Sequence, residues 1–461
     1  KGYTSLSRSS RRTIKITQRL SRTHTSTVYP QNGRIPCLSM IATAHISTWG
    51  MAIQLQSHRS DRRPTMTTGK TKATVGIAIV GNGFAADFHT ANYKRVTGLE
   101  ARLVGIYGPR PEGRQAFAEK HGFEKVYPDL DALLDDPEVD MVDICVPNKF
   151  HEDMVIKALK SGKHAVIEKP FTGAFERGQD EGSWEKCLTD GLQSADRMIQ
   201  AEKDSGRTIM YAENLIYAPG VQKARRLLDA ADTPILRIVG EESHSGTHSP
   251  YAMAWETSGG GSLYNKGCHS LGAALHLKYE EGKRRLGKRI RPQWVVAAVA
   301  NLTKTEAFES EEKHTIRTGW QDCEDWGMMV VGFDDGSIAQ INSADIVLGG
   351  IQNLLTVYAT RAAIKVNINP NDAVLAYAPD DEAFGDEYIR EKVETKSGWQ
   401  FTNPDEDWMN GFPHEIQDFC ECAVSGRAPI SDSVLGRDVV AVSYSAYLSA
   451  ATGRRVEVPT N

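Results

Sequence analysis

The segment VGIAIVGNGFAADFH, which begins at Val75, limits the possible folds of this chain more than any other stretch. Residues 75–80 are a continuous apolar run, typical of a strand buried on both faces of a parallel sheet. Gly81, Gly83 and Ala86 follow with the spacing G-x-G-x-x-A. In a dinucleotide-binding fold these residues give a tight turn, close approach of a pyrophosphate and close packing of the next helix. We therefore predict cofactor binding by Gly81, Gly83, Phe84 and Ala86.

Segments typical of strands and helices alternate over the next 130 residues. Strands are expected at 101–108, 139–147, 164–170 and 208–214, and helices at 111–121, 129–136, 151–161 and 194–203. Strands separated by helices indicate a doubly wound parallel sheet. Ligands of such sheets bind at the carboxyl ends of the strands, where the loop EKPF begins at Glu168. Lys169 is thus expected to face the crevice that holds a nicotinamide.

The end of the second strand bears on the choice of cofactor. An NAD-binding fold usually has Asp or Glu there to bind the ribose hydroxyls, but this chain has Gly108, followed by Arg110. An arginine beside a missing carboxylate suits a 2′-phosphate, and Arg114 is a second candidate. We predict NADP rather than NAD, with Arg110 as its ligand. The alternative interpretation of Arg110 is a solvated loop residue.

The second half of the chain follows another plan. Several short strands succeed one another without helices between them, which indicates a mostly antiparallel sheet in an α+β domain. The stretch GGGSLYNKGCH leads into an expected helix, on which Asn265 and His269 share one face. A histidine and an amide in a cleft can bind a hydroxyl and remove its proton. The alternative is that His269 is an ordinary core histidine.

Taken together, GNGFAADFH, CVPNKFH, EKP, YAENLIYAP and GGGSLYNKGCH make residues 74–458 resemble the Gfo/Idh/MocA oxidoreductases. The resemblance implies a Rossmann domain, here expected at 71–214, and a substrate-binding and oligomerisation domain at 215–461. It implies a homo-oligomer, a dimer or tetramer, formed through the open C-terminal sheet. It also implies that Lys169 binds the reacting hydroxyl and that His269 transfers the proton.

Other roles follow from the same resemblance. The family usually has Asp where this chain has Asn265, and an amide can position a hydroxyl but cannot accept its proton. Pro147, Asn148 and His151 resemble the loop beside the nicotinamide, as Glu168 does with Lys169; the alternative for His151 is a helix cap. Tyr217 is an expected substrate contact because it follows a strand end near the site. His244, Tyr251 and Trp255 are expected contacts because their mixture of aromatic and polar groups suits a sugar. The alternative for the last three is an interface loop.

Composition sets the remaining expectations. The net charge is −5, but residues 1–65 carry eleven basic residues and one acidic residue. Residues 1–70 are expected to be a disordered leader, either a targeting segment or non-native upstream sequence, with Met66 as the candidate start. The acidic remainder and the lack of long apolar runs predict neither a nucleic-acid nor a membrane partner. Seven scattered cysteines predict a reducing, cytoplasmic setting, and the histidine spacing predicts no metal site.

We therefore predict an NAD(P)-dependent oxidoreductase that acts on a secondary alcohol of a sugar, a sugar derivative or a cyclitol. Two alternatives are open. One is a glycoside hydrolase that uses NAD for transient oxidation and elimination, and the other is a non-catalytic regulator that senses the cofactor. Residues 172–191 form an insertion near the site, and their sequence allows a lid, an oligomer contact or an idle loop.

Overall fold

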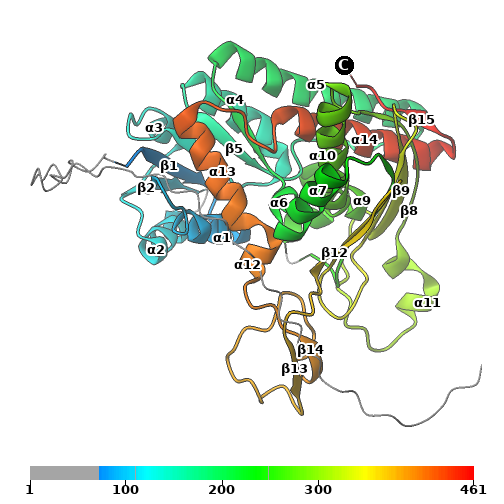
Figure 1. The fold of residues 1–461 in the computed structure, drawn as a ribbon. Coiled ribbons are helices and arrows are strands. Elements are labelled where there is room, and N and C mark those ends of the chain that lie inside the picture. The colour runs from blue at the N-terminus through cyan, green and yellow to red at the C-terminus, as the bar shows by residue number, and fades with distance from the viewer. Residues whose placement is uncertain (1–71, 109–110, 248, 461) are drawn as a thin grey trace, which may run out of the picture. The chain divides into compact units, whose positions relative to one another are not determined.

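The computed structural model describes residues 72–460 except 109, 110 and 248. The predicted leader and Arg110 lie outside the described residues. Figure 1 shows two sheets with helices packed against them.

Six parallel strands form the first sheet, in the order β3-β2-β1-β4-β5-β6. The strands are β1 (Thr74–Val80), β2 (Glu100–Tyr107), β3 (Lys125–Val126), β4 (Met141–Ile144), β5 (His164–Glu168) and β6 (Ile209–Ala212). The connecting helices are α1 (Phe84–Tyr93), α2 (Pro111–His121), α3 (Leu130–Leu134), α4 (His151–Lys160) and α5 (Glu181–Ser205). This confirms the doubly wound sheet. The strand order reverses between β1 and β4, the place where such folds bind a dinucleotide.

Helix α5 differs from the expectation, because it begins at Glu181 rather than near Ser194. Asp180 and Ser183 form a reciprocal capping box that starts the helix within the 172–191 insertion. The rest of the insertion is packed and not idle. Trp184 is buried, stacks on Tyr447 and meets Trp255 edge-to-face. The indole of Trp255 donates to the Ala174 carbonyl at 2.9 Å.

Seven strands form the second sheet, in the order β12-β11-β7-β10-β9-β8-β15. They are β7 (Ile235–Ser243), β8 (Pro292–Ala300), β9 (Trp326–Phe333), β10 (Ile338–Ala344), β11 (Gln352–Ala359), β12 (Ala363–Asn369) and β15 (Val456–Glu457). Only the pair β7–β10 is parallel among the described strands of this sheet, which confirms a mostly antiparallel arrangement. Helices α7 (Pro219–Ala231), α10 (Gly267–Leu286) and α14 (Ser433–Thr452) cover one face (Figure 1).

The helix expected to carry both Asn265 and His269 is interrupted. Asn265 ends the short α9 (Ser262–Asn265), whereas His269 lies in the first turn of α10. Between them Lys266 has φ −106° and ψ −49°, away from regular helical values. The two side chains therefore do not share a face in the expected way, and each forms its own hydrogen bonds.

The chain after residue 214 also packs on the first sheet. Phe88 of α1 lies against Phe412 of α13 (Phe412–Ser425), with ring centroids 4.5 Å apart. Arg437 of α14 binds Asp196 of α5 at 2.6 Å. Residues 69–461 accordingly form one compact unit, although the two sheets divide near the predicted boundary. The described residues contain no helix long and apolar enough to span a bilayer.

Candidate active site

The glycine-rich turn after β1 fits a dinucleotide phosphate. Gly81 has φ +119°, and a Cβ there would lie 2.2 Å from the Cys145 carbonyl oxygen, so only glycine is accommodated. At Gly83 a Cβ would meet no described atom within 4 Å, so the backbone is open to close approach. Gly83 is also the N-cap of α1 and provides no side-chain acceptor for the first-turn N–H groups. These donors and the helix dipole suit a pyrophosphate, and Ala86 is fully buried behind them.

Arg114, the second arginine suggested for a 2′-phosphate, forms hydrogen bonds within the protein near the end of β2. Its Nη1 donates to the carbonyl oxygens of Tyr127 and Pro128 at 2.6 and 2.9 Å, and its guanidinium lies over the Tyr107 ring. This buried arginine is therefore engaged in holding the end of β2. Arg110 therefore stays the arginine predicted to bind a 2′-phosphate.

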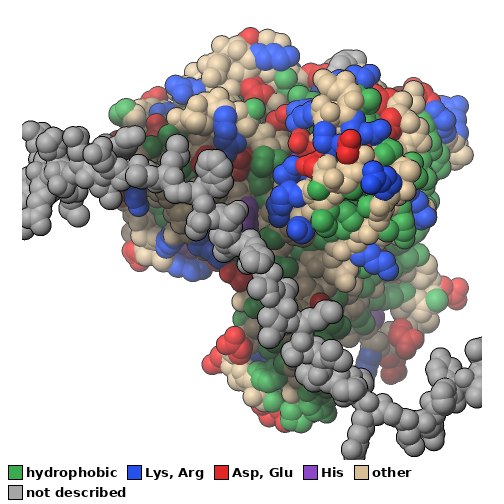
Figure 2. All heavy atoms as spheres, viewed as in Figure 1, with side chains coloured by type: hydrophobic (Ala, Val, Ile, Leu, Met, Phe, Trp, Pro, Cys, Tyr) green, Lys and Arg blue, Asp and Glu red, His purple; other side chains and the backbone are tan. Residues whose placement is uncertain are grey.

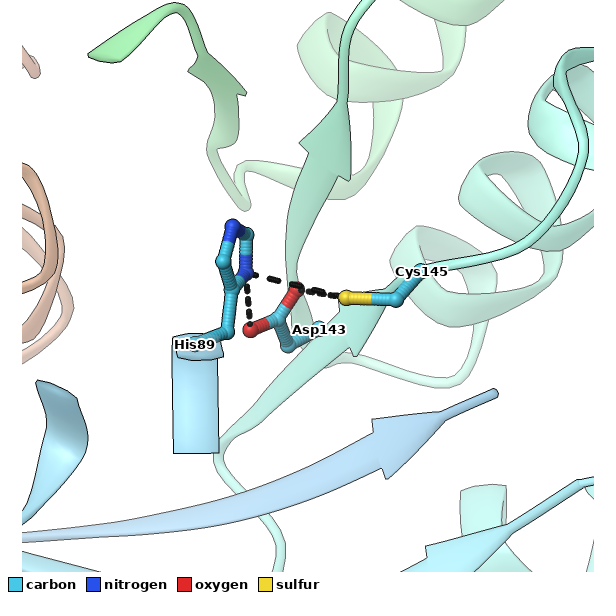
Figure 3. A group of neighbouring side chains, drawn as sticks. All are labelled: His89, Asp143 and Cys145. Carbon is cyan, nitrogen blue, oxygen red and sulfur yellow. Dashed lines mark hydrogen bonds and ion pairs between the residues drawn. The ribbon is translucent and has the colours of Figure 1, made fainter. Parts of the chain in front are cut away.

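A buried histidine links the glycine-rich helix to the EKP loop. His89 of α1 lies between two carboxylates, with Nδ1 2.9 Å from Asp143 and Nε2 3.1 Å from Glu168. Figure 3 shows His89 and Cys145 both directed at Asp143. Burial opposes the charge, but Asp143 raises the pKa of His89 well above its usual value. His89 is therefore an imidazolium that neutralises two carboxylates, a state in which neither ring nitrogen can ligate a metal.

Glu168 and Lys169 end β5 at the carboxyl edge of the first sheet. One Glu168 oxygen pairs with His89, and the other accepts the Lys169 backbone N–H at 2.9 Å. Burial raises the pKa of Glu168, but His89 outweighs that effect and lowers it. Burial alone would lower the pKa of Lys169, yet acidic groups around it, including Glu168 and Glu242, raise it. Lys169 is therefore a protonated ammonium group at neutral pH.

His151 and Asn148 hold the loops together. His151 is fully buried, and its ring nitrogens face the carbonyl oxygens of Val146 at 2.9 Å and Pro170 at 3.1 Å. Both nitrogens thus face backbone carbonyls of the CVPNKFH and EKPF segments. Asn148, which follows Pro147, donates to the Ser258 carbonyl at 2.6 Å and is 3.5 Å from Asn265 Oδ1.

The amide of Asn265 is likewise engaged in the structure of the site wall. Its Nδ2 donates to the carbonyl oxygens of Gly260 and Gly261 at 2.5 and 3.3 Å. These bonds fix the three-glycine turn that precedes α9. Asn265 therefore acts through its contacts with Asn148 and the glycine turn, rather than through His269.

Acidic side chains surround His269. Its Nδ1 lies 2.7 Å from Oε1 of Glu213, a fully buried residue that follows β6. Glu242 of β7 is also buried, and its Coulomb interactions with His269 and Lys169 lower its pKa. Burial is the larger effect and raises the pKa of Glu242 to about 7. Lys169, Glu242, Glu213 and His269 thus form one buried cluster at the meeting of the two sheets.

The expected substrate residues lie in different environments. Tyr251 is partly exposed and acts electrostatically on Lys169, so it borders the cluster. His244 is buried 3.6 Å from Asp345, and its Nδ1 accepts the Gly246 N–H. Tyr217 and Trp255, also expected as substrate contacts, are buried and engaged within the protein. The hydroxyl of Tyr217 is bonded to Asp418 and Ser431, and Trp255 is a core residue only 1% exposed.

Sequence reasoning missed three members of this region: His89, Glu213 and Glu242. His89 and Glu213 stood in quoted motifs, GNGFAADFH and YAENLIYAP, but the spacing gave no sign of their partners. Glu242 could have been noticed, because it continues the alternating buried positions Ile238 and Gly240 of β7 with a carboxylate.

Comparisons with known proteins agree with this geometry. Residues 75–181 match the family model GFO_IDH_MocA, described as an oxidoreductase family with an NAD-binding Rossmann fold. A levoglucosan dehydrogenase from Pseudarthrobacter phenanthrenivorans is 24% identical over 322 residues, which cover 66% of this chain and 77% of that protein. A myo-inositol 2-dehydrogenase from Thermotoga maritima is 21% identical over 83% of this chain and 98% of its own length.

Solved structures give the same fold. GenD2 from gentamicin A biosynthesis, crystallised in complex with NAD, superposes with a TM-score of 0.70 at 21% identity, covering 86% of this chain and 99% of that one. The resemblance to the Gfo/Idh/MocA oxidoreductases is thereby confirmed. The chain is an oxidoreductase with a nicotinamide-dinucleotide-binding Rossmann fold.

Proposed function

We propose that this oxidoreductase transfers hydride between a nicotinamide dinucleotide and a secondary alcohol of a sugar, a sugar derivative or a cyclitol. The observation that carries the proposal is the largely buried cluster of Lys169, His269, Glu213 and Glu242, in which Lys169 and Glu213 follow the carboxyl ends of β5 and β6. Two relatives are named as dehydrogenases of levoglucosan and myo-inositol, which are polyhydroxylated rings.

Within the cluster, one side chain stabilises the developing charge and another transfers the proton. The bound dinucleotide supplies the hydride acceptor or donor. The Lys169 ammonium donates to the reacting oxygen and stabilises the negative charge that develops there. His269 accepts the hydroxyl proton during oxidation and returns it during reduction. Asn265 and Asn148 hold the glycine turn beside the site, and Tyr251 borders its exposed side.

The preference for NADP rests on the absence of a carboxylate at Gly108 and on Arg110, since Arg114 is engaged by backbone carbonyls. GenD2 was crystallised with NAD, so NAD is the alternative to be measured beside it. If Arg110 binds the 2′-phosphate, Arg110→Ala lowers kcat/KM for NADP about tenfold and leaves kcat/KM for NAD unchanged. Equal losses with both cofactors would leave Arg110 as a solvated loop residue.

The test of the reaction uses the full chain with NADP or NAD and a panel of sugars, cyclitols and aryl glycosides. We expect reduced nicotinamide to form with at least one polyol. Lys169→Ala lowers kcat by about 100- to 1000-fold, because the developing charge loses its donor. Lys160→Ala, at the exposed end of α4, is the matched control and keeps the wild-type rate.

Two other outcomes separate the alternatives. Release of aglycone without net cofactor reduction identifies a glycoside hydrolase that oxidises its substrate transiently. Tight cofactor binding without turnover on any compound of the panel, with Lys169→Ala fully functional in the cell, identifies the regulator.

The predicted homo-oligomer is part of the same proposal. The uncovered face of the second sheet carries apolar side chains, among them Val296, Met328 and Val330, on adjacent strands. A second copy of this chain is the expected occupant of that face.

A further inference from the structure

Glu213 is a buried acidic residue to which the reaction outlined above gives no part. It follows β6 directly, and no part of the residue is exposed. Its Oε1 lies 2.7 Å from Nδ1 of His269, while its Oε2 has no hydrogen-bond partner among the described residues. Burial of a carboxylate with one oxygen unsatisfied costs free energy. That cost is offset here by the single short bond to the imidazole.

The helix that carries His269 is shaped to admit this carboxylate. Gly272 lies three residues after His269 on α10, and a Cβ there would lie 2.7 Å from Cγ of Glu213. Any larger residue at position 272 would therefore push Glu213 away from the ring. The absence of a side chain at Gly272 is a second feature, independent of the hydrogen bond, that fixes the pair.

No other described carboxylate or amide is bonded to the His269 ring. The neighbouring amide Asn265 is engaged by the carbonyl oxygens of Gly260 and Gly261. Glu242 of β7 interacts electrostatically with His269, but no hydrogen bond joins their side chains. The orientation of the imidazole is thus set by Glu213.

We propose that Glu213 is a positioning residue that holds His269 in the tautomer with the proton on Nδ1, which leaves Nε2 as the group that exchanges a proton with the substrate. A carboxylate can only accept a hydrogen bond, so the ring nitrogen facing it must donate. The carboxylate also stabilises the imidazolium formed once Nε2 has taken a proton.

This inference rests on the proposed oxidation of a secondary alcohol, in which the atoms balance as follows. The O–H bond of the alcohol breaks and its proton goes to Nε2 of His269. The C–H bond breaks, its electron pair leaves as hydride to the oxidised nicotinamide, and a C=O bond forms. The imidazolium, bonded to Glu213 through Nδ1–H, then releases the proton from Nε2 to solvent.

The test compares Glu213→Gln with wild type. The glutamine amide can donate or accept, so it no longer fixes the tautomer and no longer balances the imidazolium charge. We expect kcat for oxidation to fall about 100-fold while KM changes less than threefold.

A readout that needs no substrate separates this proposal from the proposed function. Two-bond ¹H–¹⁵N spectra of histidine-labelled protein, with His269→Gln to assign the signal, report which ring nitrogen of His269 carries the proton. Wild type should show the Nδ1–H form, and Glu213→Gln should show a mixture or the other form. If wild type turns over no sugar but the spectra behave in this way, the proposed function fails and the positioning role stands.

The matched control is Glu202→Gln. Glu202 is a largely buried carboxylate of α5 that accepts from the Ile209 backbone at the other end of β6, away from the cluster. It should leave kcat and the His269 signal at wild-type values. The proposal is overturned if Glu213→Gln, with a wild-type circular dichroism spectrum, keeps kcat within twofold or leaves the His269 tautomer unchanged.

Discussion

At the scale of single residues, the candidate site consists of ionisable side chains that are buried and compensate one another. His89 neutralises Asp143 and Glu168, and Glu213 is bonded to His269. Glu242 is less well compensated, since it lacks an ion pair of this kind among the described residues and its Oε2 has no hydrogen-bond partner there. A group of this kind makes stability depend on pH.

Replacement of Glu242 by glutamine isolates that dependence. The pKa of Glu242 is raised from 4.5 to about 7 by burial. Between these values the folded state keeps a proton that the unfolded state has lost, so the free energy of unfolding falls as pH rises through this window. Glu242→Gln lacks this loss. It should therefore gain stability over wild type, from near zero below pH 4.5 to about 3 kcal/mol at pH 8.

Urea unfolding of both proteins at pH 4, 6 and 8 measures the difference. Glu324, whose pKa burial likewise raises to about 7, contributes equally to both proteins and cancels. A difference that is constant across these pH values would show that Glu242 is ionised at little cost.

The residue scale is also where sequence reasoning was weakest. Motifs mark Lys169 and His269, whereas Trp255 was assigned to the substrate from its residue type and Tyr217 from its place after a strand. The indole of Trp255 is bonded 81 residues away in the sequence, to Ala174, and Tyr217 is bonded 201 residues away, to Asp418. No local pattern specifies such partners. The Glu213–His269 pair, 56 residues apart, was missed for the same reason.

At the scale of elements, prediction was better, because strand and helix periods are local properties. The alternation of apolar runs and helices identified the first sheet, and strands in succession identified the second. The errors lie at element ends. The Asp180–Ser183 capping box, present in the sequence as DEGS, marks the start of α5 thirteen residues before the expected one. The break at Lys266, in contrast, has no evident signal in the sequence.

Helix α14 is the element that connects the two sheets, and its N-cap is a testable point. Asp432 accepts from the Leu435 N–H at 3.0 Å and pairs with Arg289 through both carboxylate oxygens. Asp432→Ala removes the cap and the ion pair and should lower the free energy of unfolding by about 2 kcal/mol. Asp432→Asn keeps a capping acceptor and should lose about half as much.

Urea denaturation of the three proteins at pH 7 gives both values. Equal losses in the alanine and asparagine variants would assign the whole effect to the Arg289 pair and none to the cap.

At the scale of the whole molecule, two apolar surfaces have no covering element within the part of the chain that the structure describes. One is the open face of the second sheet, opposite α7, α10 and α14 (Figure 1). The other is the two-stranded ribbon of β13 (Leu375–Ala378) and β14 (Gly398–Phe401), where the cross-strand pairs Leu375–Phe401 and Tyr377–Trp399 are exposed. Figure 2 shows hydrophobic side chains gathered on this two-stranded ribbon. Exposed apolar patches of this kind commonly mark association sites.

The open sheet face is the surface through which we expect copies of the chain to associate. Val330 lies at the middle of β9, with Val296 of β8 and Gln340 of β10 as its cross-strand neighbours. An arginine at this position brings a charge into the centre of the interface, where it is desolvated without a partner. Val330→Arg should therefore convert a dimer or tetramer into a species of lower mass, measured by light scattering, without loss of secondary structure. Trp399→Arg, on the ribbon, should leave the mass unchanged. The two surfaces are formed by different sheets, so the two variants test them independently. Dissociation by Trp399→Arg alone would show that the interface is formed by the ribbon and not by the open sheet face.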